Sequence, residues 1–218
     1  MMFEPFSIKH ILPLLRGVLV TLRICGITIA CASVIGVIVG WASLSHNRII
    51  RTISKAYVNI MRGIPLLVIL FIAYYGIPIL TGVDVSQNVA SIGGLTIYAG
   101  AYISEIVRGS ILAVPHGQTE AAHALGMNEF QRMFIIIIPQ AIRYIIPPFV
   151  GFVVSLIKDS SLVSTIGYID LMRYGRIVSN LTLAPFTTYL CVAALYFIIC
   201  FFFTRLSGYL EKRLQRGR

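Results

Sequence analysis

Long apolar runs without a charged residue divide this chain of 218 residues. Four of them lie at residues 24–47, 63–83, 85–104 and 177–204, and the last is most apolar from residue 185 onward. About 20 apolar residues of α-helix cross a bilayer, and a charge at its centre is costly, so each run predicts a transmembrane helix. A fifth apolar stretch opens at residues 144–157 and is followed by Lys158, Asp159 and Asp170. We therefore expect an all-α integral membrane protein with five transmembrane helices.

The composition supports a membrane protein over a soluble one. Hydrophobic residues make up 57% of the chain and charged residues 12%, and the mean hydropathy is +0.87. Soluble domains are about half apolar and a quarter charged, so a water-soluble enzyme is nearly excluded. The net charge of +10 could mean nucleic acid, a membrane surface, or the cytoplasmic loops of a membrane protein. The hydropathy favours membrane lipid and argues against nucleic acid.

The basic residues predict the orientation in the membrane. Five spans place the two termini on opposite sides, and Lys and Arg gather in cytoplasmic loops. With the N-terminus outside, twelve of the 18 Lys and Arg residues lie inside. We therefore expect the N-terminus outside and the C-terminus in the cytoplasm.

The termini differ from the predicted spans. Residues 1–17 mix Lys9, His10 and Arg16 with apolar side chains and have no cleavage site of a signal peptide, a pattern typical of an interfacial segment. Residues 205–218 form a basic tail, which the topology places in the cytoplasm. No repeat or linker divides the chain, so residues 1–218 are expected to form a single transmembrane domain.

The chain lacks the motifs of an energy-converting or metal enzyme. None of its four lysines ends a Gly-Lys-Ser/Thr phosphate-binding loop. The four histidines do not form the i, i+4 pair of a zinc helix, and the four cysteines match no zinc or redox spacing. We expect no catalytic residues, no metal site and no cofactor bound by this chain.

The longest predicted cytoplasmic loop spans residues 105–143, too long for a simple connector. Residues 119–125 combine strong helix formers before Gly126, which predicts a short helix with Glu120 in its first turn, near the positive end of the helix dipole. Ala121, Ala122 and Ala124 would give this helix a surface of small residues. We expect another protein to dock on this loop.

A second helix is predicted after the Gly126 turn. Asn128 and Gln131 have the spacing of a capping box that opens a helix. The apolar residues 133–138 continue it, and Pro139 is expected to end it.

These residues carry a resemblance to a known family. Glu120-Ala121-Ala122, Gly126, Ile136 and Ile138-Pro139 are similar, in type and spacing, to the EAA loop of permease subunits in binding-protein-dependent ABC importers. Ile138 stands where that loop usually has Leu. The resemblance implies that these residues contact an ATPase subunit and that the short helix is a coupling helix.

Further motifs resemble the polar amino acid uptake branch of this family. They are Thr21-Leu22, Arg62-Gly63-Ile64-Pro65-Leu66-Leu67, the run 101–109, Lys158-Asp159-Ser160-Ser161-Leu162 and Leu210-Glu211-Lys212-Arg213-Leu214. The resemblance implies a type I importer permease of the bacterial inner membrane. It also implies an amino acid substrate, a second permease copy or paralogue that completes the pathway, an extracytoplasmic solute-binding protein, and an ABC ATPase dimer that holds ATP and Mg²⁺.

Polar residues near the end of the fourth span form a second candidate site. Charges inside a membrane are often functional, so Ser155, Lys158, Asp159 and Ser160 are candidates for the translocation pathway. The alternatives are that Lys158 and Asp159 belong to an outer loop or hold spans together.

Other residues of the spans have structural interpretations. Glu105 and Arg108 are expected to pair on one helix face, and Arg62 to anchor a span at the headgroups. Pro147-Pro148 marks either a hinge or the first turn of its helix. Ala32, Gly36 and Gly40 form a small-residue stripe for close helix packing.

Two other classes of function remain open at this stage. A passive channel or secondary transporter for small polar solutes would need no docking loop, and secondary transporters usually show internal repeats, which are absent here. A non-catalytic structural subunit of a membrane complex would show no transport of its own.

Overall fold

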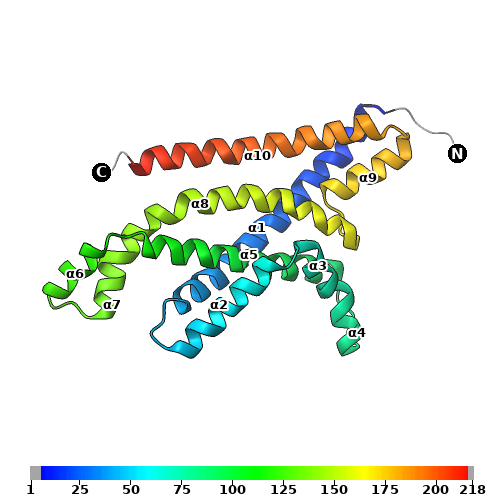
Figure 1. The fold of residues 1–218 in the computed structure, drawn as a ribbon. Helices are drawn as coiled ribbons and strands as arrows, with labels where there is room; N and C mark the ends of the chain where they lie inside the picture. The colour runs from blue at the N-terminus through cyan, green and yellow to red at the C-terminus, as the bar shows by residue number, and fades with distance from the viewer. Residues whose placement is uncertain (1–5, 216–218) are drawn as a thin grey trace.

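The computed structural model describes residues 6–215, which form a series of helices (Figure 1). In chain order these are η1 (Ile8–His10), α1 (Ile11–Ala42), α2 (Arg48–Gly63), α3 (Leu66–Phe71), η2 (Ile72–Gly76), α4 (Ile77–Thr81), α5 (Gln87–Leu112), α6 (His116–Ala124), α7 (Glu129–Gln131), η3 (Arg132–Ile137), α8 (Ile138–Asp159), η4 (Ser160–Ile166), α9 (Leu171–Thr182) and α10 (Pro185–Gln215). The segments η2 and η3 are π-helical. No strand occurs in this range, which confirms the all-α prediction.

The structure contains four or five segments that could cross a membrane. Four continuous helical stretches are long and apolar enough: Ile8–Ala42, Gln87–Leu112, Glu129–Ile166 and Pro185–Leu206. The pair Arg48–Gly63 and Leu66–Thr81 also qualifies, although it bends by 102°. Counted as one broken span, this pair brings the number to the predicted five.

The bend between α2 and α3 has a local cause. Pro65 has no amide hydrogen, and its ring disfavours a helical conformation at the residue before it. Ile64 accordingly has φ −98° and ψ 133°, which is extended backbone. The chain leaves α2 at Gly63 and restarts as α3 at Leu66. The hydropathy pattern predicts one straight span at residues 63–83. In the structure these residues form only the second half of a broken span.

The core forms where α1 crosses α5. Ala32 is fully buried on α1 and packs in the same cluster as Leu95, Ala99 and Ile103 of α5. A Cβ atom added to Gly36 would lie 2.5 Å from Ile103 Cγ2, so this contact requires glycine. The predicted small-residue stripe of the first span is therefore used for packing within the chain.

The ends of the helices gather at two ends of the molecule (Figure 1). The start of α1, the helix α9 and the start of α10 lie together at one end, and α6, α7 and the end of α10 lie at the other. We call the second the α6 end. The separation of the start of α1 from the end of α10 agrees with an odd number of spans.

Several predicted boundaries move in the structure. The helix α1 begins at Ile11, so residues 11–17 continue the first span; residues 1–5 of the expected interfacial segment, and residues 216–218 of the expected basic tail, lie outside the described range. The helix α5 runs on to Leu112, past Glu105 and Arg108, whose side chains pair one turn apart. Only residues 113–128 of the expected loop 105–143 lie between the long helices.

The prediction that Pro139 ends a helix is wrong. Pro139 lies in the first turn of α8, and the helical path runs without a break from Glu129 to Ile166. Proline inside an α-helix removes one hydrogen bond and clashes with the carbonyl four residues earlier. The π-helical turn Arg132–Ile137 immediately before it widens the helix where that carbonyl lies, and thereby accommodates the ring.

Pro147 and Pro148 lie in the interior of α8, which starts at Ile138. The first of the two interpretations, a hinge, stays a prediction, and the second, a first turn, is wrong. Prolines at these positions leave the carbonyls of Arg143 and Tyr144 without their usual partners.

Candidate functional site

The short helix α6 is defined by signals at both ends. Pro115, with ψ 135°, is its N-cap and turns the chain away from α5. At the other end Gly126 has φ +72°, a conformation that favours glycine. The amide of Met127 donates to the Ala122 carbonyl (3.1 Å) and that of Gly126 to the His123 carbonyl (2.9 Å). This is the Schellman pattern of helix termination, so α6 ends sharply.

A capping box opens the next helix, as predicted. Asn128 Oδ1 accepts from the amide of Gln131 at 2.9 Å, and Gln131 Oε1 accepts from the amide of Asn128 at 3.1 Å. The helix continues through η3 into α8. The turn between α6 and α7 is thus only four residues long and is closed by hydrogen bonds on both sides.

Glu120 occupies a different place in its helix than expected. Because Pro115 starts α6 at His116, Glu120 is the fifth residue of the helix and not part of its first turn. The helix dipole acts mainly within the first turn, so the predicted dipole stabilisation is wrong. The carboxylate instead contacts His116 Nδ1 at 3.1 Å, one turn earlier. The Glu120 side chain is 71% exposed and can reach a partner.

One face of α6 packs on the protein and the other is open. Ala122 is 2% exposed. Ala121 and Ala124 are exposed, and so are Leu125 at 77% and Phe130 at 68%. Of the other two residues of the predicted motif, Ile136 is half-buried and Pro139 exposed. The structure therefore presents a small-residue face bordered by large apolar side chains at the α6 end.

An apolar cluster joins this segment to the long helices. Val114, Ile137 and Ala141 are buried together, with Ile111 and Tyr144 packed against them. These residues come from the end of α5, the connection to α6, the π-helix η3 and the start of α8. The segment that carries α6 is thus packed against both α5 and α8.

A polar contact also ties α6 to the following helix. His123 Nε2 lies 3.0 Å from Arg132 Nη1 and 3.9 Å from Glu129 Oε1. Glu129 and Arg132 form an ion pair one turn apart. His123 therefore connects the last turn of α6 to the first turns of the next helix.

The second candidate set lies elsewhere, at the end of α8 and the start of η4, and its members differ in exposure. Ser155 and Lys158 are exposed, and Asp159 is half-buried. Ser160 is fully buried, and its hydroxyl donates to the Ile157 carbonyl at 2.8 Å. These four residues stay a prediction for the translocation pathway.

Asp170 is a buried carboxylate that the sequence pattern did not single out. It is 0% exposed, and its Oδ1 accepts from the amide of Arg173 at 2.9 Å, which caps α9. The Tyr196 hydroxyl of α10 donates to Oδ2 at 3.5 Å. Burial raises the pKa of this carboxyl to about 6. An Asp directly before an amphipathic segment is the usual signal of an N-cap and could have identified it.

The chain is similar to known membrane transport proteins. Residues 32–216 match the family described as binding-protein-dependent transport system inner membrane component. YckA of Bacillus subtilis (strain 168), described as a probable amino-acid ABC transporter permease protein, is 36% identical over 91% of this chain and 88% of its own length. GlnM of the same organism, described as a probable glutamine ABC transporter permease protein, is 35% identical over 99% of this chain and 97% of its own.

Solved structures agree with these relatives. A crystal structure of an amino acid ABC transporter with histidines superposes with a TM-score of 0.92 at 32% identity, covering 98% of this chain and 100% of that one. The inward-facing MetNI methionine ABC transporter shares the fold, with a TM-score of 0.82 at 22% identity over 96% of this chain and 99% of that one. With five possible spans and the type I ABC permease fold, this chain belongs to the inner membrane components of binding-protein-dependent transport systems and is a multi-pass permease subunit of that family.

Proposed function

We propose that this chain forms the translocation pathway of an ATP-driven amino acid importer together with a second permease, its own copy or a paralogue. The amino acid cargo is suggested by YckA, GlnM and the amino acid ABC transporter to which the chain is similar. The observation that carries the proposal is α6, a capped helix with an exposed small-residue face at one end of the molecule.

The helix α6 acts as the coupling helix. Ala121 and Ala124 let another protein approach the backbone closely, and the exposed Leu125 supplies apolar contact area. Glu120 offers a carboxylate to a basic group of the partner. The partner is a dimer of ABC ATPase subunits, which supplies ATP with its Mg²⁺; this chain contributes the docking surface.

The packing of α6 supports a lever mechanism. Only residues 113–115 separate α6 from α5, and the capped turn 125–128 separates it from the helical path that becomes α8. A displacement of α6 is passed to both long helices, because its connections to them are short and Val114, two residues before α6, is buried against Ile137 and Ala141. Closure of the ATPase dimer would tilt α5 and α8 and open the pathway on alternate sides.

The remaining partners follow from the orientation. With the α6 end in the cytoplasm, the end that holds α9 and the start of α10 faces outward. An extracytoplasmic solute-binding protein delivers the amino acid there. The apolar faces of the spans contact membrane lipid.

The test is the coupled activity of a reconstituted complex. Ala121→Arg places a large charged side chain on the exposed face of α6, whereas Ala113→Arg places the same side chain at an exposed position before α6. We expect Ala121→Arg to abolish co-purification of the ATPase and ATP-dependent amino acid uptake in proteoliposomes. The matched control, Ala113→Arg, should retain most of both.

Two results would contradict the proposal. Amino acid uptake by the purified chain without ATPase and ATP would identify a channel or secondary transporter. Normal ATPase binding and uptake in Ala121→Arg would show that α6 is not the coupling surface.

A further inference from the structure

Helix α2 has little buried surface of its own. Of its 16 residues, only Ser54 and Val58 are buried. At its end, the extended backbone at Ile64 and the bend of 102° interrupt the helical hydrogen bonds that would fix its angle to α3. The position of α2 therefore depends on its side-chain contacts with the helices beside it.

Two aromatic side chains join α2 to α5. The Tyr57 hydroxyl donates to the Ile97 carbonyl at 2.6 Å. Gly100 of α5 leaves room for this contact, since a Cβ atom added to it would lie 3.0 Å from the hydroxyl oxygen. Near the end of α2, the Arg62 guanidinium lies 5.3 Å from the centroid of the Tyr102 ring, within the range of a cation–π contact. These contacts connect the middle and the end of α2 to α5.

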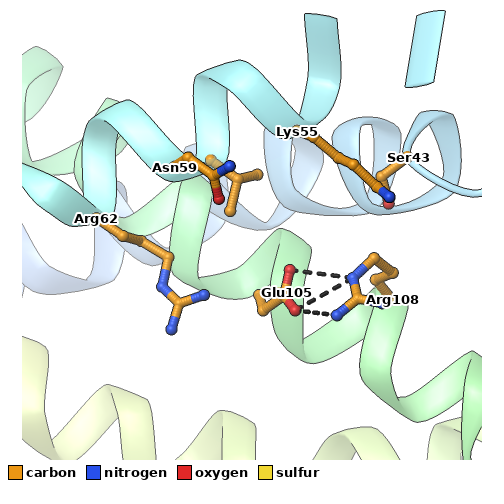
Figure 2. A pocket seen from close by; sticks show the side chains of 7 residues that line it. Ser43, Lys55, Asn59, Arg62, Glu105 and Arg108 are labelled. Atoms are coloured by element: carbon orange, nitrogen blue, oxygen red, sulfur yellow. Dashed lines mark hydrogen bonds and ion pairs between the residues drawn. The ribbon is translucent and has the colours of Figure 1, made fainter. Parts of the chain in front are cut away.

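Glu105 adds an electrostatic contact one turn after Tyr102 (Figure 2). It lines a pocket of about 210 Å³ between the two helices, and its carboxylate lies between the side chains of Lys55 and Arg62. These two cations are seven residues apart, which is about two turns on one side of α2. A single carboxylate between them therefore attracts both. Arg108 donates to both carboxylate oxygens from α5 itself and orients the side chain.

The charge of Glu105 decides whether the two helices attract or repel each other here. Among the residues that line the pocket, it is the single carboxylate beside Lys55, Arg62 and Arg108. Without it, Arg108 of α5 would repel the two cations of α2. The Glu105 side chain is 32% exposed, so water screens these charges only in part.

These contacts lie on the helix that leads into α6. Glu105 is two turns before the end of α5, and a displacement of α6 that moves α5 carries Glu105 and Tyr102 with it. Helix α2 then follows α5. The bend at Ile64 and Pro65 lets the angle between α2 and α3 change without breaking a helix.

We propose that Glu105 is a positioning residue that fixes α2 to α5, so that the first half of the broken span moves with α5 when the ATPase displaces α6. This inference rests on the proposed function and extends the moving part from α5 and α8 to a third helix. Glu105 acts through Lys55 and Arg62 and not through a contact with the substrate.

The experiment measures the distance between α2 and α5 in the reconstituted complex by pulsed electron paramagnetic resonance. The four native cysteines are replaced by alanine, and spin labels are attached through Ala56→Cys of α2 and Leu112→Cys of α5, both at exposed positions. We expect this distance to agree within about 2 Å between the nucleotide-free complex and the complex trapped with ATP and vanadate, because the two helices move together. Glu105→Gln keeps the shape of the side chain and removes its charge, and should make the two states differ by more than this amount.

A second pair of labels reports whether α2 moves at all. Ala56→Cys with Ile79→Cys, at an exposed position of α4, spans the bend and should change its distance between the two states. The matched control Arg48→Gln removes an exposed cation of α2 that does not line the pocket, and both distances should then follow the wild type. Three results would overturn the proposal: a wild-type distance between α2 and α5 that changes beyond this limit, a constant distance across the bend, or wild-type behaviour of Glu105→Gln.

Uptake separates a positioning role from a purely structural one. Glu105→Gln should keep the co-purification of the ATPase and a melting temperature close to that of the wild type. It should take up at least tenfold less amino acid per ATP hydrolysed. A lower melting temperature with an unchanged ratio is the result of a purely structural contact and would refute the positioning role alone. A wild-type complex that transports no amino acid would refute the proposed function itself.

Discussion

Gly36 lies at the closest approach of α1 and α5, where an added Cβ would be 2.5 Å from Ile103 Cγ2. Gly26, on the same helix, is exposed and has nothing within 4 Å of its added Cβ. We expect Gly36→Ala to destabilise the protein by about 1–3 kcal/mol, since overpacking forces the backbones apart. Gly26→Ala should be neutral or slightly stabilising. Thermal unfolding in detergent measures both, and equal effects of the two substitutions would contradict the packing argument.

We expect the buried carboxyl of Asp170 to make the stability of the protein depend on pH. Burial raises its pKa from 3.8 to about 6, so the folded protein binds a proton more tightly than the unfolded chain does. The stability contributed by this group is therefore greatest below pH 4 and is lost as the pH rises through 6, by up to about 3 kcal/mol.

Asp170→Asn tests whether this carboxyl causes the pH dependence of stability, because asparagine cannot titrate but can still accept the cap hydrogen bond from the Arg173 amide. We expect the variant to be more stable than the wild type at pH 7 and to lose this advantage near pH 4. The melting temperatures of both proteins between pH 4 and 7 provide the measurement. A constant difference over this range would mean that Asp170 does not titrate there.

At the scale of elements, the turn between α6 and α7 decides whether α6 can transmit force. Gly126 has φ +72°, which asparagine tolerates and a β-branched residue does not. We expect Gly126→Val to strain the turn by about 1–3 kcal/mol and to reduce coupled ATP hydrolysis in the reconstituted complex severalfold. Gly126→Asn should retain most of it. Equal activities would show that the sharp turn is dispensable.

Local signals predicted the elements around this turn, and longer-range packing explains the errors. Gly126 and the pair Asn128 and Gln131 act within a few residues, so their roles follow from the sequence. The length of a charge-free run, however, reflects apolarity and does not give the length of the helix. The helix α5 continues past the end of its charge-free run to Leu112, because Glu105 pairs with Arg108. No sequence pattern predicts that a π-helical turn accommodates Pro139.

The contact of Arg62 of α2 with the Tyr102 ring of α5 shows the same limit more strongly. Arg62 lies at the edge of an apolar run, and its expected contact with headgroups stays a prediction. Its contact with Tyr102 depends on the 102° bend after Gly63 and on the packing of α2 against α5, which bring together residues 40 positions apart. Among the candidate pathway residues, Ser160 differs from the others for a related reason, since it already belongs to the following 3₁₀ turn and faces the core.

At the scale of the whole molecule, the orientation in the membrane decides which partner meets which end. Twelve of the 18 Lys and Arg residues favour a cytoplasmic α6 end, and coupling to an ATPase requires it. Ser86 and Gln118 report on this directly, because both are exposed and they lie next to opposite ends of α5. In a variant whose four native cysteines are replaced by alanine, Ser86→Cys should react with a membrane-impermeant maleimide on intact cells. Gln118→Cys should react only after the membrane is permeabilised. The reverse pattern would place α6 outside, where it could meet no ATPase.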